Sequence, residues 1–121
     1  MNTINTTKAT RDAIKALFKI KALPPKGHFH IVRVDGSQEF HCYKPTIEKV
    51  HQLLGIEAMC CTVTIAHDVV MILSDSGAID GSPVNTKAGN IARICIPGYP
   101  HRLHGPVAIV RDSDMGEGEE V

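Results

Sequence analysis

The stretch DGSPVNTKAGNIAR, residues 80–93, carries the residues of this chain that are best suited to binding an anion. Pro83 restricts the backbone just before Asn85, and Asn85 is placed to cap a helix that begins at Thr86. The N–H groups of a first helical turn attract phosphate, and Lys87 and Arg93 add positive charge nearby. A plain loop with a capped helix is the alternative interpretation, since a Walker loop, GxxxxGK[ST], is absent.

Histidines form the second group with possible chemistry. His28 and His30 would share one face of a strand, and His101 and His104 lie three residues apart in a loop. Together they would supply four zinc ligands, although a polar strand face explains the first two equally well. Because no carboxylate or cysteine stands at a recognised metal spacing, we predict no metal site. The pair His67-Asp68 lies between two β-branched runs, where a turn is expected rather than a metal phosphohydrolase motif.

No sequence motif marks this chain as an enzyme. GxSxG, HExxH, paired carboxylates and the two His-x-Thr/Ser motifs of two-histidine phosphoesterases are all absent. We therefore expect a binding protein with no catalytic residues and no cofactor.

Composition argues against nucleic acid and membranes as partners. Lys plus Arg number 13, as do Asp plus Glu, so no overall charge favours a polyanion. A basic stripe on the first predicted helix could contact phosphates. However, the chain has only three Phe, two Tyr and no Trp, so it offers few aromatic side chains on which nucleic-acid bases could stack. No apolar run approaches the roughly 20 residues that span a bilayer. The stripe comprises Lys8, Arg11, Lys15 and Lys19.

Hydrophobic periodicity and turn residues predict a mixture of helices and strands. The expected helices cover residues 7–23, 44–55 and 86–92. The expected strands cover residues 28–34, 38–43, 59–66, 69–73, 94–96 and 107–110, with loops at 74–83 and 97–106. Asp35-Gly36 predicts a tight hairpin between the first two strands, and Thr46 and Gly55 are expected to bound the second helix.

This order predicts an α+β fold, namely a two-layer sandwich with a mainly antiparallel sheet, two or three helices and an N-terminal helical extension. Residues 1–25 would form the basic amphipathic helix, 26–111 a single α+β domain and 112–121 an acidic disordered tail. The four cysteines form no CxxC pair, so we expect reduced, mostly core-packing thiols in a cytoplasmic protein. They are Cys42, Cys60, Cys61 and Cys95.

Several features of the sequence follow one another in an order that resembles a known pattern. They are a helix ending in Gly55, a strand pair, an acidic-Gly turn at 75–77, a Pro-Val-Asn-x-x-Ala box at 83–88 and Gly105 before a final strand. This ordered set is similar to a family of small phage- and plasmid-borne domains of unknown function. The resemblance covers about residues 31–110 and brings no catalytic residue with it.

The resemblance implies a phage setting, in which small proteins without catalytic motifs often oppose host defence. We expect a cytoplasmic homo-oligomer in the host cell that sequesters a nucleotide-like, phosphate-bearing ligand, with Tyr99 or His101 stacking on a base. Inhibition of a host defence protein is the first alternative, and a metal-dependent phosphoesterase using the four histidines is the second. The candidate ligand-binding residues are Ser82, Asn85, Thr86, Lys87, Arg93, Tyr99, His101, Arg102 and His104.

Overall fold

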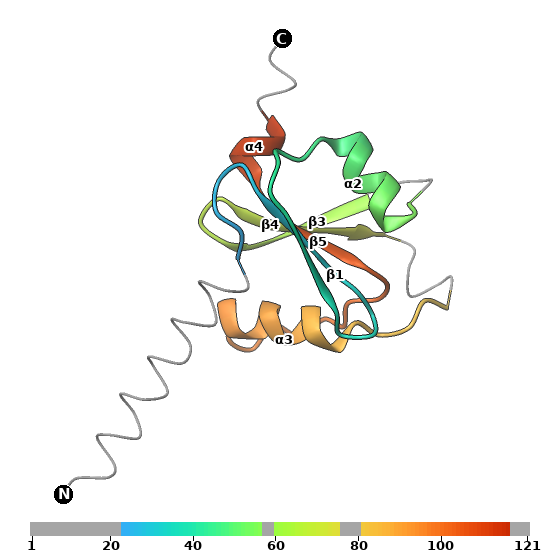
Figure 1. Ribbon diagram of the computed structural model, residues 1–121. Coiled ribbons are helices and arrows are strands. Elements are labelled where there is room, and N and C mark those ends of the chain that lie inside the picture. The colour runs from blue at the N-terminus through green and yellow to red at the C-terminus, as the bar shows by residue number, and fades with distance from the viewer. Residues whose placement is uncertain (1–22, 57–59, 76–80, 117–121) are drawn as a thin grey trace, which may run out of the picture.

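The computed structural model describes residues 23–56, 60–75 and 81–116, and its centre is a five-stranded antiparallel sheet (Figure 1). The strand order across the sheet is β2-β1-β5-β4-β3. The strands are β1 (Phe29–Val32), β2 (Gln38–His41), β3 (Cys60–Ala66), β4 (Val69–Ser74) and β5 (Val107–Arg111). The described helices are α2 (Ile47–Leu54), α3 (Thr86–Cys95) and α4 (Asp112–Gly116). The α+β class predicted from the sequence is therefore confirmed.

Both hairpins turn where the sequence predicts. Asp35-Gly36 connects β1 and β2, where the Arg33 amide donates to the Ser37 carbonyl over 2.8 Å and Gly36 adopts φ +92°. His67-Asp68 connects β3 and β4, and Asp68 takes a left-handed φ of 58°. Asp is one of the few residues other than Gly that adopts this conformation at low cost. The turn at His67-Asp68 is thus confirmed.

Local capping signals set both ends of α2. The Thr46 side chain accepts a hydrogen bond from the Lys49 amide, and Gly55 ends the helix in the left-handed conformation with φ 69°. Val50 and Leu54 are buried on its inner side. The helix predicted over 44–55 is confirmed, with its regular part between the two caps.

Helices pack on both faces of the sheet, as Figure 1 shows with α3 on one side and α2 and α4 on the other. One apolar cluster joins α3 to Val32, Met71 and Ile109, and a second lies under α2 around Phe29, Ile31 and Val110. The interior strands β1 and β5 are buried on both faces. β5 accordingly has an unbroken apolar run from Val107 to Val110, whereas β1 includes the buried His30. This arrangement does not confirm the expected two-layer sandwich, because helices cover both faces of the sheet.

The strand expected over residues 94–96 is wrong. Helix α3 continues to Cys95, and the Ile96 amide donates to the Ala92 carbonyl over 2.7 Å. Ile91, Ala92 and Cys95 recur at helical spacing and contact the same apolar cluster. Burial at this period therefore outweighs the β-branched composition of the segment.

The expectation of a disordered tail over 112–121 also needs correction, because Asp112–Gly116 forms helix α4. Asp114 is 3% exposed and accepts a 2.7 Å hydrogen bond from the Gly27 amide, while Asp68 accepts from the Ser113 amide over 2.8 Å. These long-range bonds hold a segment whose acidic composition alone predicts disorder. Residues 117–121 lie outside the described residues, as do the predicted N-terminal helix up to residue 22 and part of the 74–83 loop.

Candidate anion-binding site

The surface at the N-terminus of α3 contains a hollow of about 340 Å³. Four of the residues predicted from the sequence line it, together with apolar neighbours and a glycine. The lining residues are Val84, Asn85, Thr86, Gly89, Arg93, Arg102 and Leu103.

Asn85 is fully buried beside the hollow, and its side chain is held by hydrogen bonds to neighbouring segments. Its side-chain oxygen accepts a 3.0 Å hydrogen bond from the Ala88 amide, which confirms the predicted helix cap. Its side-chain nitrogen donates to the Val32 and Gly105 carbonyls, each over 2.9 Å. Because protein partners engage both ends of the amide, Asn85 positions the start of α3, and its predicted contact with a ligand stays a prediction.

Backbone pairing brings Arg102 to the same place. The Asn85 amide donates to the Leu103 carbonyl over 2.7 Å, and the Gly105 amide donates to the Pro83 carbonyl over 2.9 Å. Val84 and His104 form an isolated antiparallel bridge between these bonds. The loop carrying Arg102 is thus fastened beside the first turn of α3, although the two are far apart in the sequence.

Arg93 reaches the hollow by lying along its own helix. A Cβ atom added at Gly89 would stand 3.4 Å from both terminal nitrogens of Arg93, so the guanidinium covers the bare backbone one turn earlier. The same guanidinium donates a 2.7 Å hydrogen bond to Asn90 Oδ1. A glycine inside a helix costs about 0.5–1 kcal/mol, and here it provides the room in which Arg93 lies.

The electrostatics of the hollow are one-sided. Among the described residues, no Asp or Glu lines it, and neither Arg93 nor Arg102 forms an ion pair with a carboxylate. The N-terminus of α3 adds the partial positive charge of the helix dipole. The arrangement is chemically suited to a phosphate or carboxylate, which guanidinium groups bind in a bidentate manner.

The other five predicted ligand residues do not line this hollow. Ser82 and His104 contact each other through the Ser82 carbonyl and His104 Nδ1, 2.8 Å apart. Lys87 Nζ donates to the Gly36 carbonyl over 3.1 Å and so joins α3 to the β1–β2 turn. Tyr99 and His101 form an edge-to-face ring pair at 5.4 Å, with Tyr99 half-buried against the α3-side core.

The four histidines considered as zinc ligands are not gathered into a site. Among the described ranges there is no group of three or more His, Cys, Asp or Glu side chains that could hold a metal ion. His30 is buried, and its Nδ1 lies 3.1 Å from the Gln38 side-chain nitrogen. His104 is engaged with Ser82 instead.

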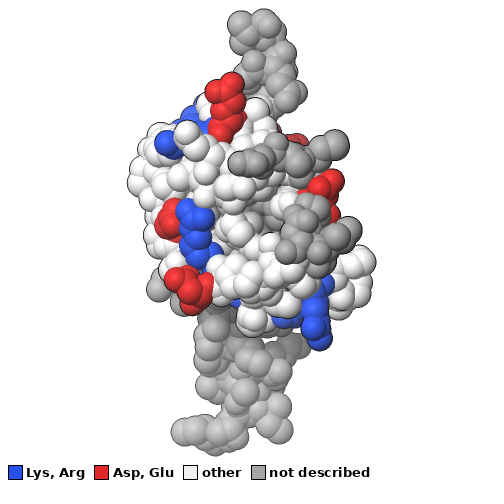
Figure 2. Space-filling model, turned by 90° about the vertical axis from the view of Figure 1, so that its right-hand side faces the viewer, with Lys and Arg blue, Asp and Glu red and all other residues white. Residues whose placement is uncertain are grey.

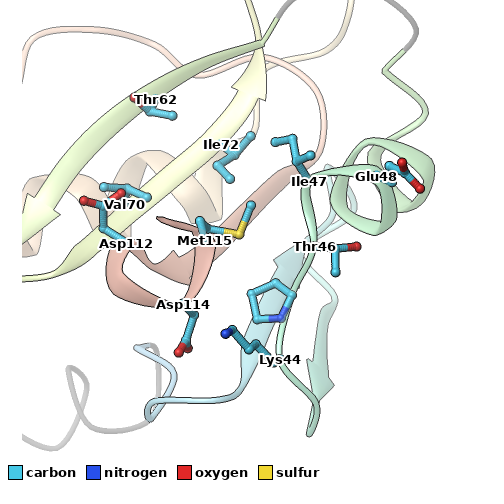
Figure 3. A pocket seen from close by; sticks show the side chains of 11 residues that line it. Lys44, Thr46, Ile47, Glu48, Thr62, Val70, Ile72, Asp112, Asp114 and Met115 are labelled. Atoms are coloured by element: carbon cyan, nitrogen blue, oxygen red, sulfur yellow. The ribbon is translucent and has the colours of Figure 1, made fainter. Parts of the chain in front are cut away.

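A second, larger hollow of about 630 Å³ lies on the opposite side of the sheet, between α2 and α4 (Figure 3). Ile47 of α2, Ile72 of β4 and Met115 of α4 surround its apolar centre, and Lys44 and Asp114 stand at one end. This hollow could not be predicted from the sequence, because part of its lining belongs to α4, a segment expected to be disordered. The one available signal was Met115, an apolar side chain within the acidic segment.

Basic side chains do not gather into one patch on the face seen in Figure 2, where blue and red groups are dispersed among uncharged atoms. One basic side chain of the β1–β2 hairpin is also paired with an acid. Arg33 Nε lies 2.8 Å from Glu39 Oε2, and this contact holds the pKa of the Glu39 carboxyl below its usual value. This face therefore offers no continuous basic surface of the kind that binds nucleic acid.

No protein-family model, curated protein or solved structure matches this chain. No helix among the described residues has both the length and the apolar character needed to cross a membrane.

Proposed function

We propose that this chain is a non-enzymatic binding protein that holds a small phosphate-bearing, nucleotide-like ligand in the hollow at the N-terminus of α3. The observation that carries the proposal is the convergence of Arg93 and Arg102 on the first turn of a helix, in a hollow whose described lining contains no carboxylate. Its volume of about 340 Å³ lies at the lower end of the range of small-molecule sites.

The residues have different roles in this proposal. Arg93 and Arg102 bind the phosphate oxygens, and the N–H groups of Thr86 and Lys87 in the first helical turn donate to the same group. Asn85 is a positioning residue, since its amide is used to fix the helix start. Tyr99 and His101 stand in the loop just before Arg102, where a base attached to the phosphate would meet an aromatic ring.

The resemblance to phage- and plasmid-borne domains supplies the biological setting. In that setting the chain acts in the host cytoplasm as a homo-oligomer, and it withdraws a nucleotide immune signal from a defence system by binding it. Sequestration requires affinity and protein copies but no chemistry, which agrees with a sequence that contains no catalytic motif.

The test is an NMR titration of ¹⁵N-labelled full-length protein with inorganic pyrophosphate, with ATP, and with adenosine as the phosphate-free control. We expect pyrophosphate and ATP to shift the amide signals of Thr86, Lys87 and Ala88 and the side-chain signals of the two arginines. Adenosine alone should leave these signals in place. Shifts confined to residues of the α2–α4 hollow would contradict the proposed site.

Two variants and a matched control sharpen this test. Arg93→Gln and Arg102→Gln should each weaken pyrophosphate binding about tenfold or more, because each removes charge-assisted hydrogen bonds. Lys49→Gln makes the same change in net charge at an exposed position of α2, on the other side of the sheet. This control variant should leave the affinity for pyrophosphate unchanged. Equal losses in all three variants would mean that only the total charge attracts the anion.

A further inference from the structure

The two edges of the sheet differ in a way that bears on assembly. At one edge, β2 has four residues and carries Glu39, which is paired with Arg33. At the other edge, β3 has seven residues, Cys60–Ala66, and contains no charged residue, no proline and no glycine. Soluble proteins usually protect sheet edges with charge, proline, a β-bulge or short length, because an unprotected edge can add a further strand. Of these devices β3 has only the register shift between Thr64 and Ala66.

The sequence of β3 is also close to self-complementary. Val63 is its midpoint, and an antiparallel copy of the strand paired about Val63 would place Val63 opposite its equivalent and Thr62 opposite Thr64. Both threonines are exposed on the α2–α4 side of the sheet, where Thr–Thr cross-strand pairs are favourable. No like charges meet anywhere in this register.

We propose that β3 is the contact surface for a second copy of this chain, paired antiparallel about a twofold axis through Val63. The result is one continuous sheet of ten strands, in which the two β2 strands form the outer edges. An isologous contact of this kind closes on itself and ends at a dimer.

Two features of the fold agree with this register. The register shift between Thr64 and Ala66 lies at one end of β3, so Cys60–Thr64 keeps regular pairing with β4 and the central three residues are undistorted. Thr62 also lines the apolar hollow between α2 and α4, which reaches the free edge there. In the dimer the two hollows lie on the same face of the sheet, on either side of the threonine pairs.

The proposal is tested by sedimentation equilibrium on the full chain and on charge-substituted variants. The wild-type chain should be a dimer. In the T62K/T64K variant each Lys would face another Lys across the axis, and in T62E/T64E each Glu would face another Glu. We expect both variants to raise the dimer dissociation constant by about tenfold or more.

Two further samples separate the proposed register from a general effect of charge. The T62K/T64E variant carries as many new charges but places unlike charges opposite each other, so it should dimerise like the wild type. An equimolar mixture of T62K/T64K and T62E/T64E should form a heterodimer. Circular dichroism of each variant checks that the exposed substitutions leave the fold intact.

Several results would overturn the proposal. A wild-type monomer throughout the concentration series would exclude the dimer. A T62K/T64K variant that still dimerises would move the contact away from β3. Failure of the T62K/T64E variant to dimerise, while folded, would exclude pairing about Val63.

Discussion

On the α3 side of the sheet, the helix is joined to its neighbours through the neutral amide of Asn85, whereas on the other side α4 is joined through carboxylates. Asn85 links the end of β1, the loop at Gly105 and the first turn of α3. At the α4 junction, Asp68 accepts hydrogen bonds from the Ser113 amide and hydroxyl. Asp114 accepts a hydrogen bond from the Gly27 amide, and Lys26 Nζ lies 3.6 Å from Asp114 Oδ1. Both junctions fasten segments that are distant in the sequence.

Because one junction is neutral and the other is charged, the two sides of the sheet should differ in how their stability depends on pH. A buried amide does not titrate, so the contacts that Asn85 makes beneath the α3 hollow should not depend on pH. Protonation removes the negative charge of a carboxylate and turns one of its oxygens into a donor, which weakens the hydrogen bonds that it accepts, so α4 should be the junction that weakens in acid. The junction at Asn85 suits the proposed anion site, because it brings no carboxylate among the described residues to compete for Arg93 and Arg102.

The largest expected effect comes from removing the neutral junction. Asn85→Ala leaves two buried carbonyls and one helix amide without their partners, so we expect the free energy of unfolding to fall by about 3–5 kcal/mol. Urea unfolding followed by circular dichroism measures this loss. Asn90→Ala makes the same substitution at an exposed position of the same helix and should change stability by less than about 0.5 kcal/mol. Equal effects at the two positions would show that Asn85 stabilises the fold no more than an exposed asparagine of the same helix does.

A smaller effect, confined to low pH, is expected at the charged junction. Hydrogen bonds from the Ser113 side chain and amide hold the pKa of Asp68 below its usual value. Stabilisation from a lowered pKa is fully present above the unfolded value of about 4 and is lost as the pH falls through the lower folded value. In Asp68→Asn, which keeps a residue tolerant of the left-handed turn, the acid-dependent part of this loss should disappear.

Thermal unfolding between about pH 2 and pH 7 measures this difference, since the range spans the pKa of an ordinary carboxyl group. The unfolding temperatures of wild type and Asp68→Asn should differ most near neutral pH and converge in acid. Asp112→Asn removes a neighbouring exposed acid without changing the Asp68–Ser113 hydrogen bonds, and it serves as the control for the loss of one negative charge. Parallel profiles for all three proteins would show that the α4 junction is no more sensitive to acid than the rest of the fold.

Sequence reasoning succeeded where the deciding interactions are local. The Asp35-Gly36 hairpin, the caps of α2 at Thr46 and Gly55, and the cap of α3 at Asn85 all depend on residues within a few positions of one another. The side chains that cap or turn the backbone act through these near neighbours, so their types alone predict the outcome.

It failed where partners come from distant segments. Helix α4 was not predicted because Asp68 and Gly27, which bond it, are far away in the sequence. The two carbonyls that Asn85 bonds belong to Val32 and Gly105, and no local pattern names them. For the candidate site, the basic residues were predicted from their types, but the meeting of Arg93 and Arg102 required the pairing of segments 83–85 and 103–105.

The smallest expected effect is also the one that best separates stability from binding on the α3 side. Gly89→Ala should raise the free energy of unfolding by about 0.5–1 kcal/mol, because alanine is the better helix former and φ at this position is ordinary. The new methyl group would stand 3.4 Å from the Arg93 guanidinium, at the near limit of ordinary van der Waals contact, and that flexible end can move aside at little cost. Because the methyl group takes up space beside which the guanidinium lies, we expect pyrophosphate affinity to fall while stability rises.

A gain in stability together with a loss of pyrophosphate affinity is expected only if Gly89 provides the space in which the Arg93 side chain lies. Urea unfolding and the pyrophosphate titration, carried out on the same preparation, measure them together. In an Arg93→Gln background the added methyl should still stabilise the helix but no longer alter affinity, because the group that it displaces has been removed. If Gly89→Ala weakened binding equally in both backgrounds, the methyl would be obstructing the hollow itself, and Arg93 would not be the group through which Gly89 acts.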